Sequence, residues 1–109
     1  MSVQDKDSVF TALQIRNTSV QTSVVSVSGE FLAKTIIVDN GLNQTVTLQL
    51  QGSDDQTLWL NIGATFDVTA TSSDYQTVSD FFPYYRITAV CSTAPTTGDL
   101  DVRVIKALA

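Results

Sequence analysis

Hydrophobic and polar residues alternate with a period of two along most of the chain. The clearest run spans 45–51, where Val46, Leu48 and Leu50 alternate with threonine and glutamine. The same alternation returns in three later segments: 57–62, 65–71 and 99–106. Successive side chains of a β-strand point to opposite faces, so each run predicts a strand with one buried and one solvated face. Because no segment shows a convincing period of 3.6, we expect an all-β chain.

Turn residues separate these runs. The Asn40-Gly41 pair predicts a tight hairpin turn, because both residues tolerate a positive φ. Further turns are expected at 52–56, 63–64 and 71–74, and Pro83 indicates a strand boundary, since proline cannot donate to a ladder. Nine candidate strands follow: 9–16, 20–28, 31–39, 44–51, 57–62, 65–71, 75–80, 85–91 and 99–106. In the alternative interpretation the first segment is an N-terminal arm, which leaves eight strands.

Many short strands at regular spacing are typical of a sandwich or a barrel. The length of 109 residues fits one domain. We therefore predict an all-β, antiparallel β-sandwich that is jelly-roll-like and has about eight strands. The sandwich is expected to form a single domain over 9–109, preceded by a flexible N-terminal segment at 1–8.

The charge pattern argues against several classes of partner. The formal net charge is −5, and the six Lys and Arg residues are scattered rather than clustered. Nucleic-acid binding depends on clustered basic residues, so no nucleic acid is expected as a partner. An acidic surface and the lack of a long apolar stretch also argue against a membrane. The polar N-terminus has no secretory signal, so we expect synthesis in a cytoplasm without secretion.

Catalytic chemistry has little support in the sequence. The chain has no histidine, which excludes the Ser-His-Asp and Cys-His arrangements and His-based zinc sites. Cys91 is the only cysteine, and its apolar neighbours predict a buried, unreactive side chain. Asp54 and Asp55 are interpreted as turn residues, with a contribution to a calcium site as the alternative. We therefore expect no enzyme, no catalytic residues, no metal and no cofactor.

Most aromatic residues lie in the second half of the chain. Trp59 and Tyr84 have the opposite phase from the apolar residues of their strands, which places them on an outer face. Such rings can stack on sugars or anchor a protein partner, although Trp59 could also cap the end of the sandwich. Arg86 and Arg103 have the outer phase too, with cross-strand ion pairs to Asp67 or Asp101 as the alternative. The candidate partner or glycan contacts are therefore Trp59, Tyr84 and Arg86, and the other Phe and Tyr residues are expected in the core.

One stretch carries a resemblance. Residues 48–59 form a strand, a Ser-Asp-Asp turn and a Trp-bearing strand, followed by the strands at 84–90 and 97–104. This order resembles small β-sandwich structural proteins of tailed bacteriophages, including capsid decoration and tail or baseplate accessory proteins. It also looks like sugar-binding sandwiches of the discoidin type, although the pair of cysteines common there is missing.

The phage resemblance implies a non-enzymatic structural protein located in a virion. Such a protein would bind a capsid or tail lattice, as a homo-oligomer, with edge strands or an N-terminal arm joining neighbouring copies. The alternative, a carbohydrate-binding β-sandwich module, depends on the exposed aromatic residues.

Overall fold

The computed structural model describes residues 4–28 and 33–107. The described residues form strands and loops without a helix, so none of their elements is a helix that could cross a membrane. The strands are β1 (Gln4–Leu13), β2 (Gln21–Thr22), β3 (Ser26–Val27), β4 (Ala33–Asn40), β5 (Val46–Ser53), β6 (Leu60–Val68), β7 (Ser72–Val78), β8 (Tyr84–Val90) and β9 (Leu100–Ala107). The prediction of an all-β chain is confirmed.

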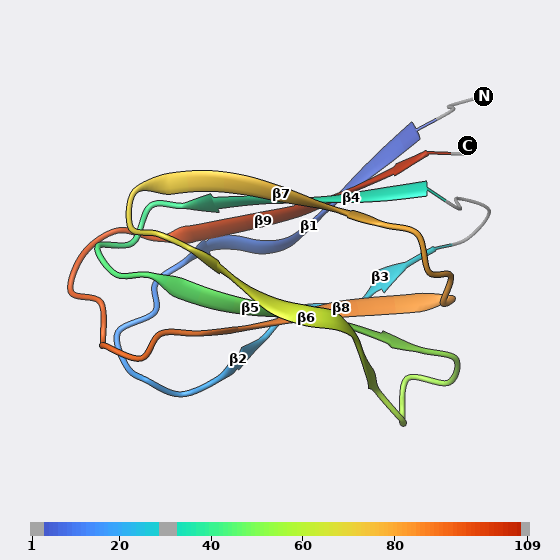
Figure 1. Ribbon diagram of the computed structural model, residues 1–109, viewed down its shortest axis with the longest axis horizontal. Helices are drawn as coiled ribbons and strands as arrows, with labels where there is room; N and C mark the ends of the chain where they lie inside the picture. Colours follow the sequence, from blue (N-terminus) through green and yellow to red (C-terminus); the bar gives the residue numbers. More distant parts are fainter. Residues whose placement is uncertain (1–3, 29–32, 108–109) are drawn as a thin grey trace.

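The strands form two antiparallel sheets that pack face to face (Figure 1). Sheet A has the order β1-β9-β4-β7, and sheet B has the order β2-β8-β5-β6, with β3 also paired to β8. The pairs are nested along the chain: β5 with β6, β4 with β7, β2 and β3 with β8, and β1 with β9. A long antiparallel ribbon rolled onto itself in this way is a jelly roll. The predicted jelly-roll-like β-sandwich is therefore confirmed.

The core lies between the sheets and follows the predicted alternation. Every second residue of β9 is buried, and Leu100, Val102 and Val104 have no exposed surface. Strands β4, β5 and β8 bury alternate residues in the same way. Burying one such aliphatic side chain contributes about 1.5–3 kcal/mol, so these inward rows supply much of the stability of the sandwich.

Several predicted strand boundaries are wrong, including the expected turn at 71–74, most of which belongs to β7. The expected strands at 57–62 and 65–71 are one strand, β6, and the expected turn at 63–64 lies inside it. Gly63 has a φ of 68° there, and the pairing of β5 with β6 shifts register between Leu48 and Leu50. A glycine with positive φ in a strand forms a bulge, which bends the strand without ending it. The expected strand at 20–28 is also divided, into β2 and β3.

The expected hairpin turn at Asn40-Gly41 is also wrong. The chain leaves sheet A at Asn40 and enters sheet B at Val46, so this segment crosses between the layers. Gly41 does not have a positive φ, and Asn40 is 1% exposed. The Asn40 side chain donates to the carbonyls of Val68 at 3.0 Å and of Thr69 at 3.1 Å. An asparagine is suited to this position because its side chain can form hydrogen bonds with the buried backbone groups at the crossing.

The sequence predicts a flexible segment at 1–8, whereas residues 4–8 form the first half of β1. Asp5 lies opposite Lys106 and Asp7 lies opposite Val104 in the pairing with β9. The alternation is hard to recognise here because β1 presents charged residues to the inner face. Residues 1–3, part of the predicted flexible segment, and residues 31–32, the start of the predicted strand at 31–39, lie outside the described residues.

Candidate functional site

The structure brings two of the three predicted contact residues together on the outer face of sheet B. The Arg86 guanidinium lies 4.3 Å from the centroid of the Trp59 ring, and its Nε donates to Gln51 Oε1 at 2.7 Å. The Gln51 amide in turn donates to Asn61 Oδ1 at 2.9 Å. Tyr84 lies two residues before Arg86 in β8, on the same half-buried face. We name Gln51, Trp59, Asn61, Tyr84 and Arg86 the Trp59 patch.

Side-chain hydrogen bonds hold the loop that carries Trp59. The Asp55 carboxylate accepts from the backbone N–H groups of Thr57 at 2.8 Å and Leu58 at 3.0 Å, and these bonds lower the pKa of Asp55. The Ser53 hydroxyl accepts from the loop backbone as well. This confirms the interpretation of the Ser-Asp-Asp segment as turn chemistry. The tight loop leaves Leu58 62% exposed beside Trp59.

The alternative of an Arg86 ion pair is wrong. Its hydrogen bond and its cation–π contact go to Gln51 and Trp59, and the salt bridges among residues 4–28 and 33–107 involve Lys106 instead. Asp67 accepts from Thr47 Oγ1 at 2.6 Å, and Asp101 accepts from the backbone of β1 at 2.9 Å. Trp59 covers the guanidinium on the outer face of sheet B. That these residues contact a partner or a glycan stays a prediction.

The expectation that the other Phe and Tyr residues are core is only partly correct. Tyr85 is 1% exposed and belongs to the core, with the ring of Phe82 packed edge-on at 6.2 Å. Tyr75 is 63% exposed, because it has the outward phase of an edge strand. Phe81 is 52% exposed in the segment after β7, where the ammonium of Lys34 lies 5.3 Å from its ring.

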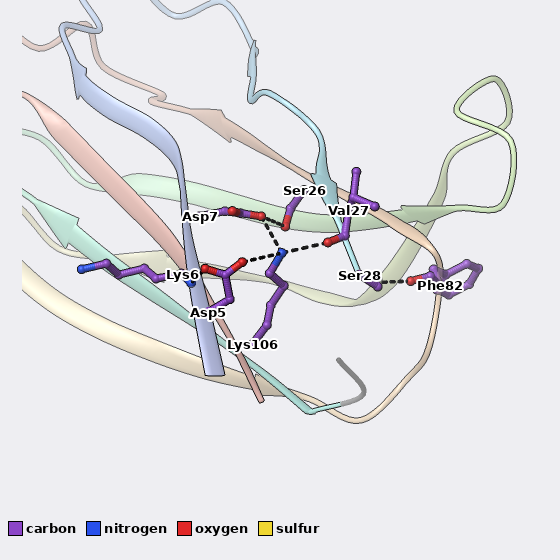
Figure 2. A network of polar contacts seen from close by, with 8 residues as sticks. All are labelled: Asp5, Lys6, Asp7, Ser26, Val27, Ser28, Phe82 and Lys106. Carbon is purple, nitrogen blue, oxygen red and sulfur yellow. Dashed lines mark hydrogen bonds and ion pairs between the residues drawn. The ribbon is translucent and has the colours of Figure 1, made fainter. Parts of the chain in front are cut away.

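A second polar site lies inside one end of the sandwich, where β1, β3 and β9 meet (Figure 2). Lys106 is nearly buried, and its Nζ lies 2.8 Å from Asp7 Oδ2, 3.9 Å from Asp5 Oδ2 and 2.8 Å from the carbonyl of Val27. Ser26 donates to the same Asp7 oxygen at 2.7 Å. Burial raises the pKa of Asp7, but the hydrogen bonds from Lys106 and Ser26 outweigh it and lower the pKa. These five residues form the Lys106 cluster.

Lys34 extends this polar end of the core. It lies opposite Lys106 in the pairing of β4 with β9, and only 3% of its surface is exposed. Its Nζ lies 4.7 Å from the ring centroid of Tyr85, a favourable cation–π contact. Burial and the charge of Lys106 lower the pKa of Lys34. Burial also raises the pKa of Tyr85, whose hydroxyl donates to the carbonyl of Asp80 at 2.6 Å.

The sequence interpretation missed the Lys106 cluster. Its signal was present, since Lys106 continues the inward row of Leu100, Val102 and Val104, and Lys34 continues that of Ile36 and Val38. Polarity suggested surface positions, whereas the alternation pointed inward. Long aliphatic stems let a lysine extend an inward row while its ammonium reaches carboxylates or rings at the rim.

The Trp59 patch and the Lys106 cluster contain side chains that form non-covalent contacts. The Trp59 patch offers an aromatic ring, a guanidinium and carboxamides. Within the described ranges, no group of three or more His, Cys, Asp or Glu residues could hold a metal ion. Cys91 is buried as predicted, and burial raises the pKa of its thiol. A buried thiol with a raised pKa is a poor nucleophile.

Two antiparallel sheets in this strand order define the chain as a jelly-roll β-sandwich, and three solved structures share the fold. The PBSX exported protein XepA superposes with a TM-score of 0.70 at 17% identity, over 94% of this chain and 37% of that chain. The SPBc2 prophage-derived protein YomS superposes with a TM-score of 0.58 at 18% identity, over 97% of this chain and 96% of the YomS chain. A chain of the Bacillus endospore appendages, described as disulfide-linked pili, superposes with a TM-score of 0.57 at 17% identity. The match covers 98% of this chain and 88% of that chain.

These identities establish a shared fold. The chain spans little more than a third of the XepA chain but nearly all of YomS. The sequence matches no protein-family model and no curated protein. The resemblance to β-sandwich proteins of phage origin is confirmed at the level of the fold.

Proposed function

We propose that the chain is a non-enzymatic structural protein of a virion, which binds a capsid or tail lattice through the Trp59 patch. The jelly-roll fold, shared with a prophage-derived protein and a pilus protein, supports an assembly role. The observation that carries the proposal is the contact between the half-buried side chains of Trp59 and Arg86 on an outer sheet face. The protein is made in the host cytoplasm without secretion and resides in the virion, without a membrane or nucleic-acid partner.

The composition of the Trp59 patch favours a protein partner. Trp, Tyr and Arg are the residues most enriched at the energetic centres of protein interfaces. Arg86 is already held by its bond to Gln51 and by the Trp59 ring, so binding costs little side-chain entropy. Leu58, next to Trp59 in the chain, is 62% exposed. An exposed leucine beside the ring adds apolar surface that a partner can cover.

Assembly as a homo-oligomer is part of the proposal. Lattice components usually associate as symmetric copies, and a sandwich has free strand edges through which copies can pair. The net charge of −5 keeps free copies soluble before they meet the lattice.

The direct test is cosedimentation of the purified chain with virions assembled without it. We expect saturable binding, and Trp59→Ala should weaken it by at least tenfold, as expected for a central interface residue. Val20→Ala is the control, because Val20 is 61% exposed and precedes β2, which pairs with Thr88 and Ala89 toward the other end of β8 from Tyr84. Absence of binding by the unmodified chain, or equal losses for both variants, contradicts the proposal.

A carbohydrate-binding module is the second candidate, because carboxamides flank the aromatic ring in the Trp59 patch. The guanidinium occupies one face of that ring, which leaves less of it for stacking on a sugar. A glycan array separates the two candidates. A signal that Trp59→Ala abolishes supports the carbohydrate candidate, whereas silence on the array with intact virion binding supports the lattice.

A further inference from the structure

Among the strands that the structure describes, β7 forms the most regular free edge of the sandwich. It pairs with β4 at every position from Ser72 to Val78 without a register shift. The other edges are protected: the β1 pairing has two irregularities, β2 and β3 have two residues each, and β6 is bulged at Gly63. The seven residues of β7 include no lysine, proline or glycine. A long, regular edge without these devices is a template for another strand.

We propose that two copies of this chain pair antiparallel through β7, about a two-fold axis at Tyr75. The inference deepens the proposed function by naming the surface through which copies associate. In this register Asp74 of each copy lies opposite Gln76 of the other copy, and Ser73 of each copy lies opposite Thr77 of the other. The carboxylate can accept from the facing carboxamide. A shift of the axis to Asp74 would set two carboxylates opposite each other, which is destabilising, so the sequence of β7 favours one register.

The backbone of Tyr75 is oriented for this pairing. Its N–H donates to Asp74 Oδ1 at 2.8 Å, so it points to the free edge and not to β4. In an antiparallel ladder the N–H and C=O of one residue face the same neighbour, so the Tyr75 carbonyl faces the free edge too. Two copies can therefore exchange two hydrogen bonds at Tyr75. The Asp74 carboxylate, displaced from that N–H, becomes available to Gln76 of the second copy.

The surface beside this edge also favours a second copy. A cleft of about 190 Å³ opens between β6 and β7, and the residues of β7 from Gln76 to Val78 form part of its wall. Its floor includes Ile36 and Leu50 of the core, and Ile62 and Phe66 in its wall are only half-buried. A copy paired to β7 extends sheet A across this opening, which removes apolar surface from water.

A disulfide test reads the register directly. Opposite residues in a hydrogen-bonded pair have Cα atoms about 5.5 Å apart, within disulfide range. Tyr75→Cys should therefore form a covalent dimer under mild oxidation, seen on a non-reducing gel. Ser73→Cys is the matched control, because its own copies would lie about 14 Å apart. The native Cys91 is buried and does not compete. Equal crosslinking by both variants, or none by Tyr75→Cys, overturns the proposal.

Light scattering provides the second test, since both polar residues that face across the axis are exposed and tolerate substitution. The unmodified chain should have twice the 11.8 kDa mass of one chain. Gln76→Glu places a carboxylate opposite Asp74 of the other copy at two positions in the dimer, and it should weaken the dimer at least tenfold. Asp74→Lys combined with Gln76→Glu should restore the dimer. Thr18→Glu, in an exposed loop, should leave the dimer unchanged. A Gln76→Glu protein that dimerises as well as the unmodified chain overturns the proposal.

The two proposals fail separately. A monomeric chain that still binds virions overturns the β7 pairing and leaves the lattice function in place. A dimer that the Gln76→Glu substitution disrupts, but that does not bind virions, supports the pairing and contradicts the lattice function.

Discussion

Replacing Asn40 with alanine should cost more stability than any other single polar truncation in the β4–β5 crossing. The Asn40 amide donates to three carbonyls, those of Gln44, Val68 and Thr69, at 3.0–3.1 Å. Its Oδ1 accepts from the backbone N–H of Leu42 at 3.0 Å. One side chain therefore joins the end of β4, the crossing and the end of β6.

The expected loss of stability depends on the backbone groups that lose a hydrogen-bond partner in Asn40→Ala. Two of the four bonds, to the Leu42 N–H and the Val68 carbonyl, are buried, and the other two are partly open to water. Each buried backbone group without a partner costs about 1–3 kcal/mol, while water can replace the partner of the other two. Asn40→Ala should therefore lower the free energy of unfolding by about 2–6 kcal/mol. Asn40→Asp should cost at least as much, because a carboxylate faces three carbonyl oxygens.

Urea unfolding followed by far-UV circular dichroism measures this loss. Asn43→Ala is the matched control: Asn43 is three residues away, and its side chain bonds only to Thr96 at an exposed position. Removing exposed bonds should cost less than about 1 kcal/mol. The melting temperature of Asn40→Ala should fall by about 10 °C or more. A difference below about 1 kcal/mol between the two variants would refute the reasoning.

Three further predictions test other parts of the fold. Gly98 has a φ of 85°, and a Cβ there would overlap a backbone oxygen, so Gly98→Ala should lower the free energy of unfolding by about 3 kcal/mol or more. Gly63 has a φ of 68° but lies in open space, so Gly63→Ala should lower it by only about 1 kcal/mol. Equal urea midpoints for the two variants would contradict this difference. Burial raises the pKa of Asp7 but the hydrogen bond from Lys106 lowers it overall, so the stability that Asp7 contributes is present above its unfolded pKa of about 3.9 and is lost as the pH falls through the folded value. Asp7→Asn should flatten that acid loss in urea titrations, and an unchanged slope would count against the Lys106 cluster. Because burial raises the pKa of the Cys91 thiol, a thiol reagent at pH 7 should label it only in denaturant, and rapid labelling of the folded chain would contradict its burial.

The period-two alternation was sufficient to predict the fold class and most of the core. Each inward aliphatic of β5, Val46, Leu48 and Leu50, is buried as the pattern indicated. Alternation reports which face a side chain takes, because that depends only on neighbours in the same strand. Turn chemistry at Ser53 and Asp55 was predictable for the same reason, since their bonds reach residues two or three positions away.

Features that depend on distant partners could not be predicted. The sequence around Asn40 resembles a hairpin turn, whereas two of the three carbonyl partners of its side chain come from residues 28 and 29 positions away. The stacking of Arg86 on Trp59 is also non-local, so the sequence suggested a shared outer face but an acidic partner for the arginine. For the candidate site, the sequence therefore predicted the residues and their face but not their contacts.

The inward-facing residues of β4 fix how the two sheets are aligned. The row reads Lys34, Ile36, Val38, Asn40, with aliphatic residues in the centre and a polar residue at each end. At one end Asn40 satisfies backbone groups where the chain crosses between sheets, and at the other the ammonium of Lys34 meets the ring of Tyr85. A polar inward residue is stable only where such partners are within reach, at the rim of the core. A shift of one sheet by two residues along the other would move Asn40 or Lys34 into the aliphatic centre, so it is unfavourable. The resulting alignment of the sheets sets the positions of β7 and the Trp59 patch at the surface.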